Sequence, residues 1–206
     1  MKGERIYAHN KMNETKKVDV KKLTLSAVMI ALSAGLSMIK VVQMPLGGSV
    51  TPLSMLPVCM IAIMYGCKWG VFCSFVYSLS QLALDIAAVV SWGLTPQALV
   101  GTIVFDYLLA FTVLGLSGMF RKHGVPGYIA GIALGISLRM VSHVISGVVF
   151  FASSMPEGWG SPLLYSLAYN GTYMLPEFVL TFAGAIFLLK EPHTSKLFKV
   201  ELPANA

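Results

Sequence analysis

Arg139 and His143 lie one helical turn apart within residues 125–152, a segment that is otherwise uncharged and mostly apolar. A charged side chain at membrane depth costs about 2.5–3.5 kcal/mol even on the mildest scales, so it is usually there for a functional reason. Residues four apart are neighbours on one face of a helix. The pair therefore predicts a membrane-spanning helix whose inner face lines a polar site rather than lipid.

Two carboxylates in other apolar segments offer partners for this pair. Asp106 stands beside Tyr107 in the stretch VFDYLLAF, and Glu177 lies in the last apolar segment. A buried carboxylate needs a cation or several hydrogen-bond donors. We expect a structural ion pair between Arg139 and Glu177. Either Arg139 or a cationic ligand would satisfy Asp106, and His143 suits an interhelical hydrogen bond and a ligand contact equally well.

The last apolar segment carries a polar aromatic strip with a four-residue spacing: Tyr165, Tyr169, Tyr173 and Glu177. Tyrosine rings stack on flat heterocycles or attract a cation by about 0.5–2 kcal/mol each. Asn170 provides both a donor and an acceptor, which suits the edge of a heterocycle. An interfacial belt of tyrosines is the alternative, but the number of polar groups favours a site. Asp106, His143, Tyr165 and Asn170 together suit a small, aromatic, cationic ligand.

The elements that would hold these side chains are membrane-spanning helices. The chain has 206 residues, of which 56% are apolar and 12% charged, and its mean hydropathy is +0.74. An ordinary soluble domain is more polar, and a helical span needs about 20 largely apolar residues. Six segments follow this pattern, the second being short: about 23–42, 52–66, 69–90, 97–119, 126–152 and 162–189. We predict an all-α integral membrane protein with six transmembrane helices.

The positions of the basic residues predict the orientation. Seven Lys and Arg precede the first segment, and six more fall in the second and fourth connections or after the last segment. All thirteen face the cytoplasm if the N-terminus does, as the positive-inside rule requires, and Lys40 and Arg139 are the other two. We expect both termini to be cytoplasmic, with a basic tail at 1–22, a membrane domain at 23–190 and a second tail at 191–206. The basic residues form no patch with interleaved aromatics, so nucleic acid is not an expected partner.

The connections on the predicted outer side carry Gly, Pro and two tryptophans. We expect Trp92 to be an interfacial anchor, whereas an anchor and a lid over an outward-facing pocket suit Trp159 about equally. The three cysteines lack a metal-ligand spacing, so we expect reduced thiols and no metal site. No phosphate-binding loop or hydrolase motif is present, so we expect no cofactor and no enzymatic activity, and ATP would act only on a partner.

Small residues at a four-residue spacing mark two faces where helices can approach closely. The first half of segment 126–152 carries a stripe that predicts a packing seam: Gly127, Gly131 and Gly135. The first apolar segment carries a second ridge: Ala27, Ala31 and Gly35. Internal packing and docking of another membrane subunit explain this second ridge equally well.

Five motifs give the chain a family resemblance. They are AVMIA, PLGGSVTPLSMLP, FDYLLAFTVLGLSGMF, RMVSHVISGVVFF and PEGWGSPLLYSLAYNGTYMLPE. Over about residues 22–190 the chain resembles the thiamine-specific (ThiT/YuaJ) group of substrate-binding S components of energy-coupling-factor vitamin transporters. This resemblance implies a six-helix fold with a thiamine pocket near the outer face, in a multi-pass protein of the bacterial cell membrane.

The resemblance also implies a set of substrate-binding residues: Asp106, Tyr107, His143, Gly147, Phe151, Trp159, Tyr165 and Asn170. In this set Asp106 would contact the ligand cation. Phe151 stands where the family has a stacking tryptophan and can still stack. A second pocket tryptophan of the family falls near Gly48, which cannot stack, and Trp159 would supply the missing aromatic face.

The mechanism implied by the resemblance is high-affinity binding of thiamine from the outside. A shared membrane T subunit and two cytoplasmic ATPases would then drive its delivery inward, with the ridge at Ala27, Ala31 and Gly35 contacting the T subunit. An S component for another vitamin or heterocycle is one alternative. A self-sufficient proton-coupled carrier with an acidic and histidine relay is another. An intramembrane enzyme is less favoured, because no nucleophile or metal motif is present.

Overall fold

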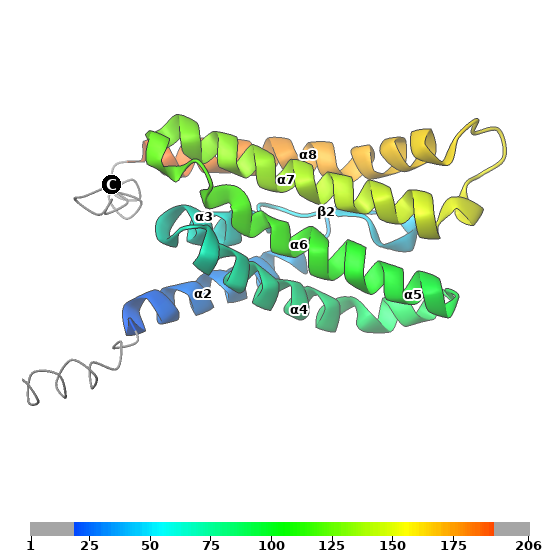
Figure 1. Ribbon diagram of the computed structural model, residues 1–206, viewed down its shortest axis with the longest axis horizontal. Coiled ribbons are helices and arrows are strands. Elements are labelled where there is room, and N and C mark those ends of the chain that lie inside the picture. Colours follow the sequence, from blue (N-terminus) through cyan, green and yellow to red (C-terminus); the bar gives the residue numbers. More distant parts are fainter. Residues whose placement is uncertain (1–18, 192–206) are drawn as a thin grey trace, which may run out of the picture.

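The computed structural model describes residues 19–191, which are mostly helical (Figure 1). The long helices are α2 (Val20–Ser37), α4 (Cys67–Ser91), α7 (Gly124–Phe150) and α8 (Pro162–Lys190). Between α4 and α7 the chain forms α5 (Pro96–Thr102), a π-helical segment (Ile103–Leu109), α6 (Ala110–Thr112) and two 3-10 segments, Val113–Gly118 and Arg121–His123. The shorter elements are α3 (Leu56–Tyr65), the antiparallel strands β1 (Val42–Gln43) and β2 (Ser49–Val50), and 3-10 turns at Pro45–Gly47 and Ala152–Ser154.

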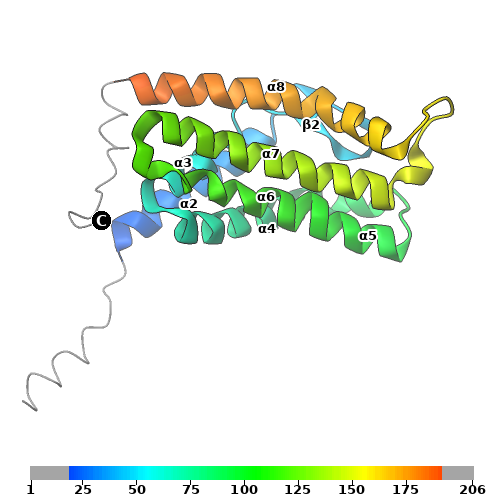
Figure 2. The ribbon, with the colours of Figure 1, turned by 45° about the horizontal axis from the view of Figure 1, so that its top comes forward.

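Four helical stretches of the described chain are long and apolar enough to cross a membrane: Val20–Ser37, Cys67–Ser91, Pro96–Phe150 and Pro162–Lys190. The third stretch is a hairpin, because the chain reverses direction between α6 and α7 (Figures 1 and 2). This stretch therefore contains two of the predicted segments, 97–119 and 126–152. Together the four stretches account for five of the six predicted segments.

The remaining predicted segment, 52–66, forms a helix too short to cross a membrane by itself. α3 has ten residues, about 15 Å of helix against a hydrocarbon core of about 30 Å. Pro57 lies in its first turn, where proline is tolerated, and Gly66 ends it with a φ of +86°. The helix is nevertheless at the centre of the core, since residues 58–63 have no exposed surface. The segment is thus as short as the sequence indicated, and the count of six spanning helices stays a prediction.

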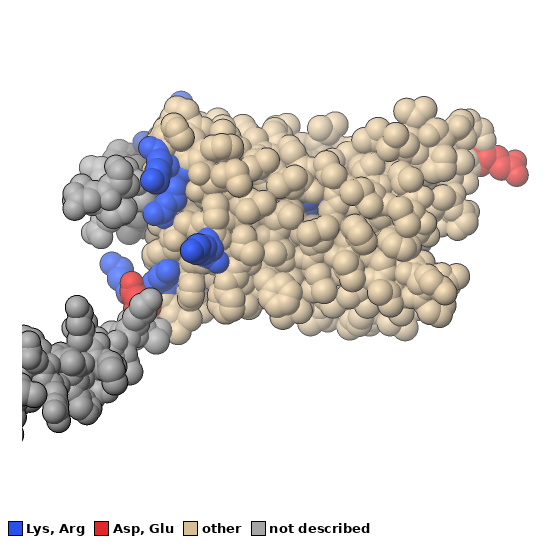
Figure 3. All heavy atoms as spheres, in the orientation of Figure 1, with Lys and Arg blue, Asp and Glu red and all other residues tan. Residues whose placement is uncertain are grey.

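Basic side chains gather at one end of the molecule (Figure 3). This is the end where α2, α4 and α7 begin and where α8 ends (Figure 1). Such an asymmetry is what the positive-inside rule predicts for a cytoplasmic face. Apart from residues 19–22 and 191, the two predicted tails lie outside the described residues, so the orientation of the termini stays a prediction.

The glycine stripe packs the first half of α7 against the 3-10 segment Val113–Gly118. A Cβ atom at Gly131 would overlap the carbonyl oxygen of Ser117, and one at Gly135 would lie 2.8 Å from the Ser117 hydroxyl. Only glycine permits so close an approach of two backbones. The predicted packing seam is confirmed.

The small-residue ridge of α2 faces outward. Ala27, Ala31 and Gly35 are all exposed, and nothing lies within 4 Å of a Cβ atom at Gly35. The helix instead buries a stripe of serines: Ser26, Ser33 and Ser37. Internal packing therefore does not explain the ridge.

Candidate functional site

A cavity of about 320 Å³ lies in the half of the molecule away from the basic end. The ends of α2 and α4, the π-helical segment, the second half of α7, the start of α8 and the β1–β2 turn all contribute to its walls. Seven of the eight residues expected to bind substrate line it: Asp106, Tyr107, His143, Gly147, Phe151, Tyr165 and Asn170. The topology thus brings side chains from three separate motifs to one site.

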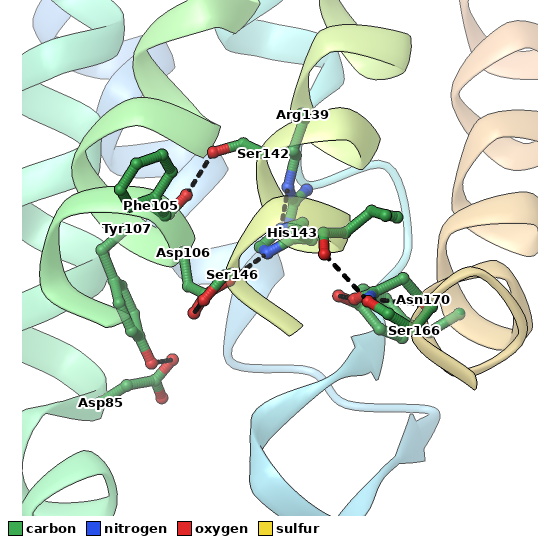
Figure 4. Close-up of polar contacts among 12 residues, drawn as sticks. Asp85, Phe105, Asp106, Tyr107, Arg139, Ser142, His143, Ser146, Ser166 and Asn170 are labelled. Atoms are coloured by element: carbon green, nitrogen blue, oxygen red, sulfur yellow. Dashed lines mark hydrogen bonds and ion pairs between the residues drawn. The ribbon is translucent and has the colours of Figure 1, made fainter. Parts of the chain in front are cut away.

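His143 connects Asp106 to the interior of the helix bundle (Figure 4). Its Nδ1 lies 2.9 Å from Asp106 Oδ1, and Arg139 Nε donates to its Nε2 over 3.3 Å. Because arginine can only donate, Nε2 must accept, so the proton of a neutral His143 sits on Nδ1 and is donated to Asp106. Ser146 Oγ donates to the other carboxylate oxygen over 2.5 Å. Neither of these two partners of Asp106 is a permanent cation.

The π-helical segment gives Asp106 and Tyr107 their positions. Consecutive residues of an α-helix point about 100° apart, yet both of these line the cavity. A π-helical turn is wider, and such turns occur frequently at functional sites. Ser142 Oγ on α7 donates to the carbonyl oxygen of Phe105 over 2.6 Å and so fastens this turn to α7. The sequence carried no signal for this irregularity.

The predicted ion pair between Arg139 and Glu177 is present. Arg139 Nη1 lies 3.3 Å from Glu177 Oε2, and both side chains are buried, with 9% and 2% of their surface exposed. Glu177 Oε1 accepts hydrogen bonds from the backbone nitrogen of Thr51 at 2.9 Å and from its hydroxyl. The guanidinium also lies over the ring of Phe111, 4.3 Å from its centroid. The pair therefore links α7 and α8 to the loop that follows β2.

The tyrosine strip of α8 forms a continuous row of rings that reaches His143. Neighbouring ring centroids along Tyr165, Tyr169, Tyr173 and His143 are 6.0, 6.2 and 6.0 Å apart. Tyr173 donates to Asn170 Oδ1 over 2.6 Å, which fixes the amide beside the row. The strip thus forms a wall of the cavity.

Of the two outer tryptophans, Trp92 and not Trp159 lines the cavity. Trp92 lines the cavity and packs on Gly47, where a Cβ atom would lie 2.6 Å from the indole ring. Trp159 is 41% exposed, packs on Tyr165 with a centroid distance of 5.3 Å, and does not line the cavity. The prediction of Trp92 as a simple interfacial anchor was incomplete, because the β1–β2 turn folds back toward the end of α4.

The same β1–β2 turn closes over α8. Tyr169 donates its hydroxyl proton to the carbonyl oxygen of Pro45. A Cβ atom at Gly48 would lie 2.6 Å from the ring of Tyr173, so this position has room for glycine alone. Gly48 therefore serves the fit of the turn against the tyrosine row.

Lys40 and Asp85 also line the cavity, and sequence reasoning did not assign them to it. Lys40 Nζ lies 3.2 Å from Asp85 Oδ1, and the Tyr107 hydroxyl donates to Asp85 Oδ2 over 3.3 Å. The available signal was a pair of opposite charges near the outer ends of the first and third apolar segments. Within residues 19–191, no group of three or more His, Cys, Asp or Glu side chains could hold a metal ion.

Residues 23–197 match the model of the thiamine transporter protein family (Thia_YuaJ). The chain belongs to this family. It is 33% identical over 186 residues to the thiamine transporter ThiT of Bacillus subtilis (strain 168), covering 82% of this chain and 89% of that protein. A solved structure of ThiT from Listeria monocytogenes has the same fold, with a TM-score of 0.68, 25% identity, and coverage of 87% of this chain and 97% of that one.

Membership of the thiamine transporter family confirms the resemblance based on the five motifs. The apolar helices make this family member a multi-pass protein of the bacterial cell membrane, and its role is transport rather than catalysis. Where the resemblance places a stacking tryptophan, Phe151 lines the cavity. The aromatic face expected from Trp159 is instead available from Trp92.

Proposed function

We propose that this family member binds thiamine in the cavity described above, with Asp106 holding the cationic thiazolium ring. The observation that carries the proposal is the charge balance of the cavity wall. Of the three acids that line the cavity, Glu177 pairs with Arg139 and Asp85 pairs with Lys40. Asp106 is the acid that has no Lys or Arg partner, so the acids of the wall outnumber its Lys and Arg by one, which suits a monocation.

The shape and polarity of the cavity support the same ligand. Its volume falls at the lower end of the roughly 300–1,000 Å³ that is common for small-molecule sites. Flat rings can stack on Phe151, Trp92 or the tyrosine row, and the Asn170 amide and Tyr165 hydroxyl suit the edge of an aminopyrimidine. We assign the predicted set to substrate binding with Trp92 added and Trp159 outside the cavity wall.

The proton-coupled alternative requires a relay from Asp106 through His143 to Glu177. Arg139 stands between the last two, since it donates to His143 over 3.3 Å and pairs with Glu177 over 3.3 Å. A guanidinium does not release its proton in proteins. This arrangement favours a binding site over a relay.

The test is a titration of the purified, detergent-solubilised protein with thiamine, followed by tryptophan fluorescence. We expect sub-micromolar binding that weakens at least tenfold in Asp106→Asn, a loss of about 1.4 kcal/mol. Glu157→Gln, which removes an exposed carboxylate outside the cavity, is the matched control. Equal affinity for thiamine in Asp106→Asn and the control would show that Asp106 does not hold the cation. Binding of another vitamin in place of thiamine would refute thiamine as the substrate.

We further propose that the protein acts as the S component of an energy-coupling-factor transporter, with a T subunit and two cytoplasmic ATPases that bind the ATP. The exposed ridge of α2 supports this proposal, because small residues at a four-residue spacing let a partner helix approach closely. The ridge would be the contact for the T subunit. Binding of thiamine would then require no ATP, whereas its delivery inward would.

Co-purification with a T subunit and two ATPases from a bacterium that carries them tests this partnership. Ala31→Trp places a bulky side chain on the ridge, and Leu32→Trp places the same side chain on an exposed neighbouring position of α2. We expect Ala31→Trp to abolish co-purification while thiamine binding by the isolated protein persists, and Leu32→Trp to retain both. Equal co-purification of the two variants would exclude the ridge as the docking face.

A further inference from the structure

A second, smaller cavity of about 210 Å³ adjoins the first at its mouth. It lies between the β1–β2 turn and the end of α4. The two cavities share five wall residues: Lys40, Gly47, Asp85, Trp92 and Tyr107. A ligand in the first cavity that carried an additional group could therefore extend that group into the second one, past Lys40 and Asp85.

The charged pair at this junction is fully engaged. Lys40 Nζ contacts Asp85 Oδ1 at 3.2 Å, and the Tyr107 hydroxyl donates to Asp85 Oδ2 over 3.3 Å. The two side chains are about 30% exposed, so the pair is partly solvated and accessible from the mouth. Tyr107 ties the pair to the π-helical segment that carries Asp106.

This pairing decides how the junction would receive an anionic group. The wall of the first cavity has two permanent cations, Lys40 and Arg139, and each faces an acid within 3.3 Å. Thiamine and its phosphate esters differ by a terminal phosphate, which binds proteins through unpaired cations and several donors. The second cavity has space for such a group, but the cation beside it is already neutralised, and the Asp85 carboxylate would repel a phosphate.

We propose that Asp85 is a specificity-determining residue, which holds Lys40 neutralised at the cavity mouth and so favours thiamine over its phosphate esters. The proposal rests on the proposed function, because it takes thiamine as the ligand of the first cavity. The second cavity has space for the phosphate, but the charges of Asp85 and Lys40 disfavour its binding. The preference for thiamine over its phosphate esters therefore depends on Asp85 and Lys40, and substitutions of these two residues should shift it in opposite directions.

The experiment compares dissociation constants for thiamine and thiamine monophosphate, measured on the purified protein at one ionic strength. In Asp85→Asn, Lys40 is left unpaired, so we expect the ratio of the monophosphate to the thiamine constant to fall at least fivefold. In Lys40→Gln, Asp85 is left unpaired, so the ratio should rise at least threefold. The double variant should lie between the two single ones, and Glu157→Gln should leave the ratio unchanged.

Opposite shifts in the two single variants support the proposal, because general damage to the site would move both ligands together. Ratios within twofold of the wild type in both variants overturn it. If Asp85→Asn does not fold, Lys40→Gln decides alone, and an unchanged ratio there overturns the proposal. If the wild type binds thiamine but the ratios do not change in the variants, only the role of Asp85 is refuted. If the wild type does not bind thiamine, the proposed function and this inference are refuted together.

Discussion

The buried ion pair between Arg139 and Glu177 allows a quantitative test of how the site is held together. Glu177→Gln keeps the shape of the side chain and an acceptor for the Thr51 backbone nitrogen, which lies 2.9 Å from Oε1. It removes the charge that faces Arg139 at 3.3 Å. Arg139 then remains a buried cation with 9% of its side chain exposed.

The expected cost follows from this geometry. Breaking a buried pair by removing one partner costs about 3–5 kcal/mol, because the remaining charge is uncompensated. For a chain of this length 1 kcal/mol shifts the melting temperature by about 2–4 °C, so Glu177→Gln should lower it by roughly 6–20 °C. Arg139→Gln should cost less, since Glu177 keeps two donors from Thr51. The double variant leaves no buried charge and should lose at least about 2 kcal/mol less than the sum of the singles.

The assay is thermal unfolding of the four proteins of this cycle in one detergent, with Glu157→Gln as an exposed control. Thiamine binding should weaken in Glu177→Gln as well, because the unpaired guanidinium lies 3.3 Å from His143, the partner of Asp106. Additive losses in the double variant, or a shift below about 2 °C in Glu177→Gln, would refute the assignment of this pair as a coupled structural element.

Two further predictions follow from close contacts in the structure. Gly131→Ala should abolish folding, because its Cβ would overlap the Ser117 carbonyl, and the loss of a monodisperse peak in size-exclusion chromatography would show this. Gly171→Ala is the control and should fold, since only one atom lies within 4 Å of its Cβ. A folded Gly131→Ala protein would contradict the packing seam. Trp92→Phe should lose most of the fluorescence change on thiamine binding, whereas Trp159→Phe should retain it, since only Trp92 lines the cavity; the opposite result would place Trp159 at the ligand.

Much of the site could be predicted from the sequence because membrane burial makes polar residues conspicuous. Arg139, His143, Asp106 and Glu177 interrupt long apolar stretches, and the cost of burying them implies that they find one another. The pairing of Arg139 with Glu177 followed from this argument. The sequence left open whether Arg139 also pairs with Asp106, because the relative axial position of the two helices that carry them cannot be predicted from the sequence.

The length of α3, the π-helical turn and the course of the β1–β2 turn were decided by tertiary structure. Hydropathy alone cannot separate a ten-residue core helix from a span when apolar residues continue on both sides. The π-helical turn also receives a contact from another helix, the hydrogen bond from the Ser142 hydroxyl to the Phe105 carbonyl. The length of α3 and the π-helical turn therefore have no local sequence signature.

By itself the sequence determined that this is a helical membrane protein with polar residues gathered inside it, because apolar length and the cost of buried charge are local properties. Beyond the pair of Arg139 and Glu177, tertiary structure decided which side chains come together at the cavity. Asp85 meets Lys40 across 45 positions of sequence, and Trp92 replaces Trp159 at the cavity because a turn from another part of the chain folds toward it. Such contacts depend on the packing of the whole bundle, which no single segment encodes.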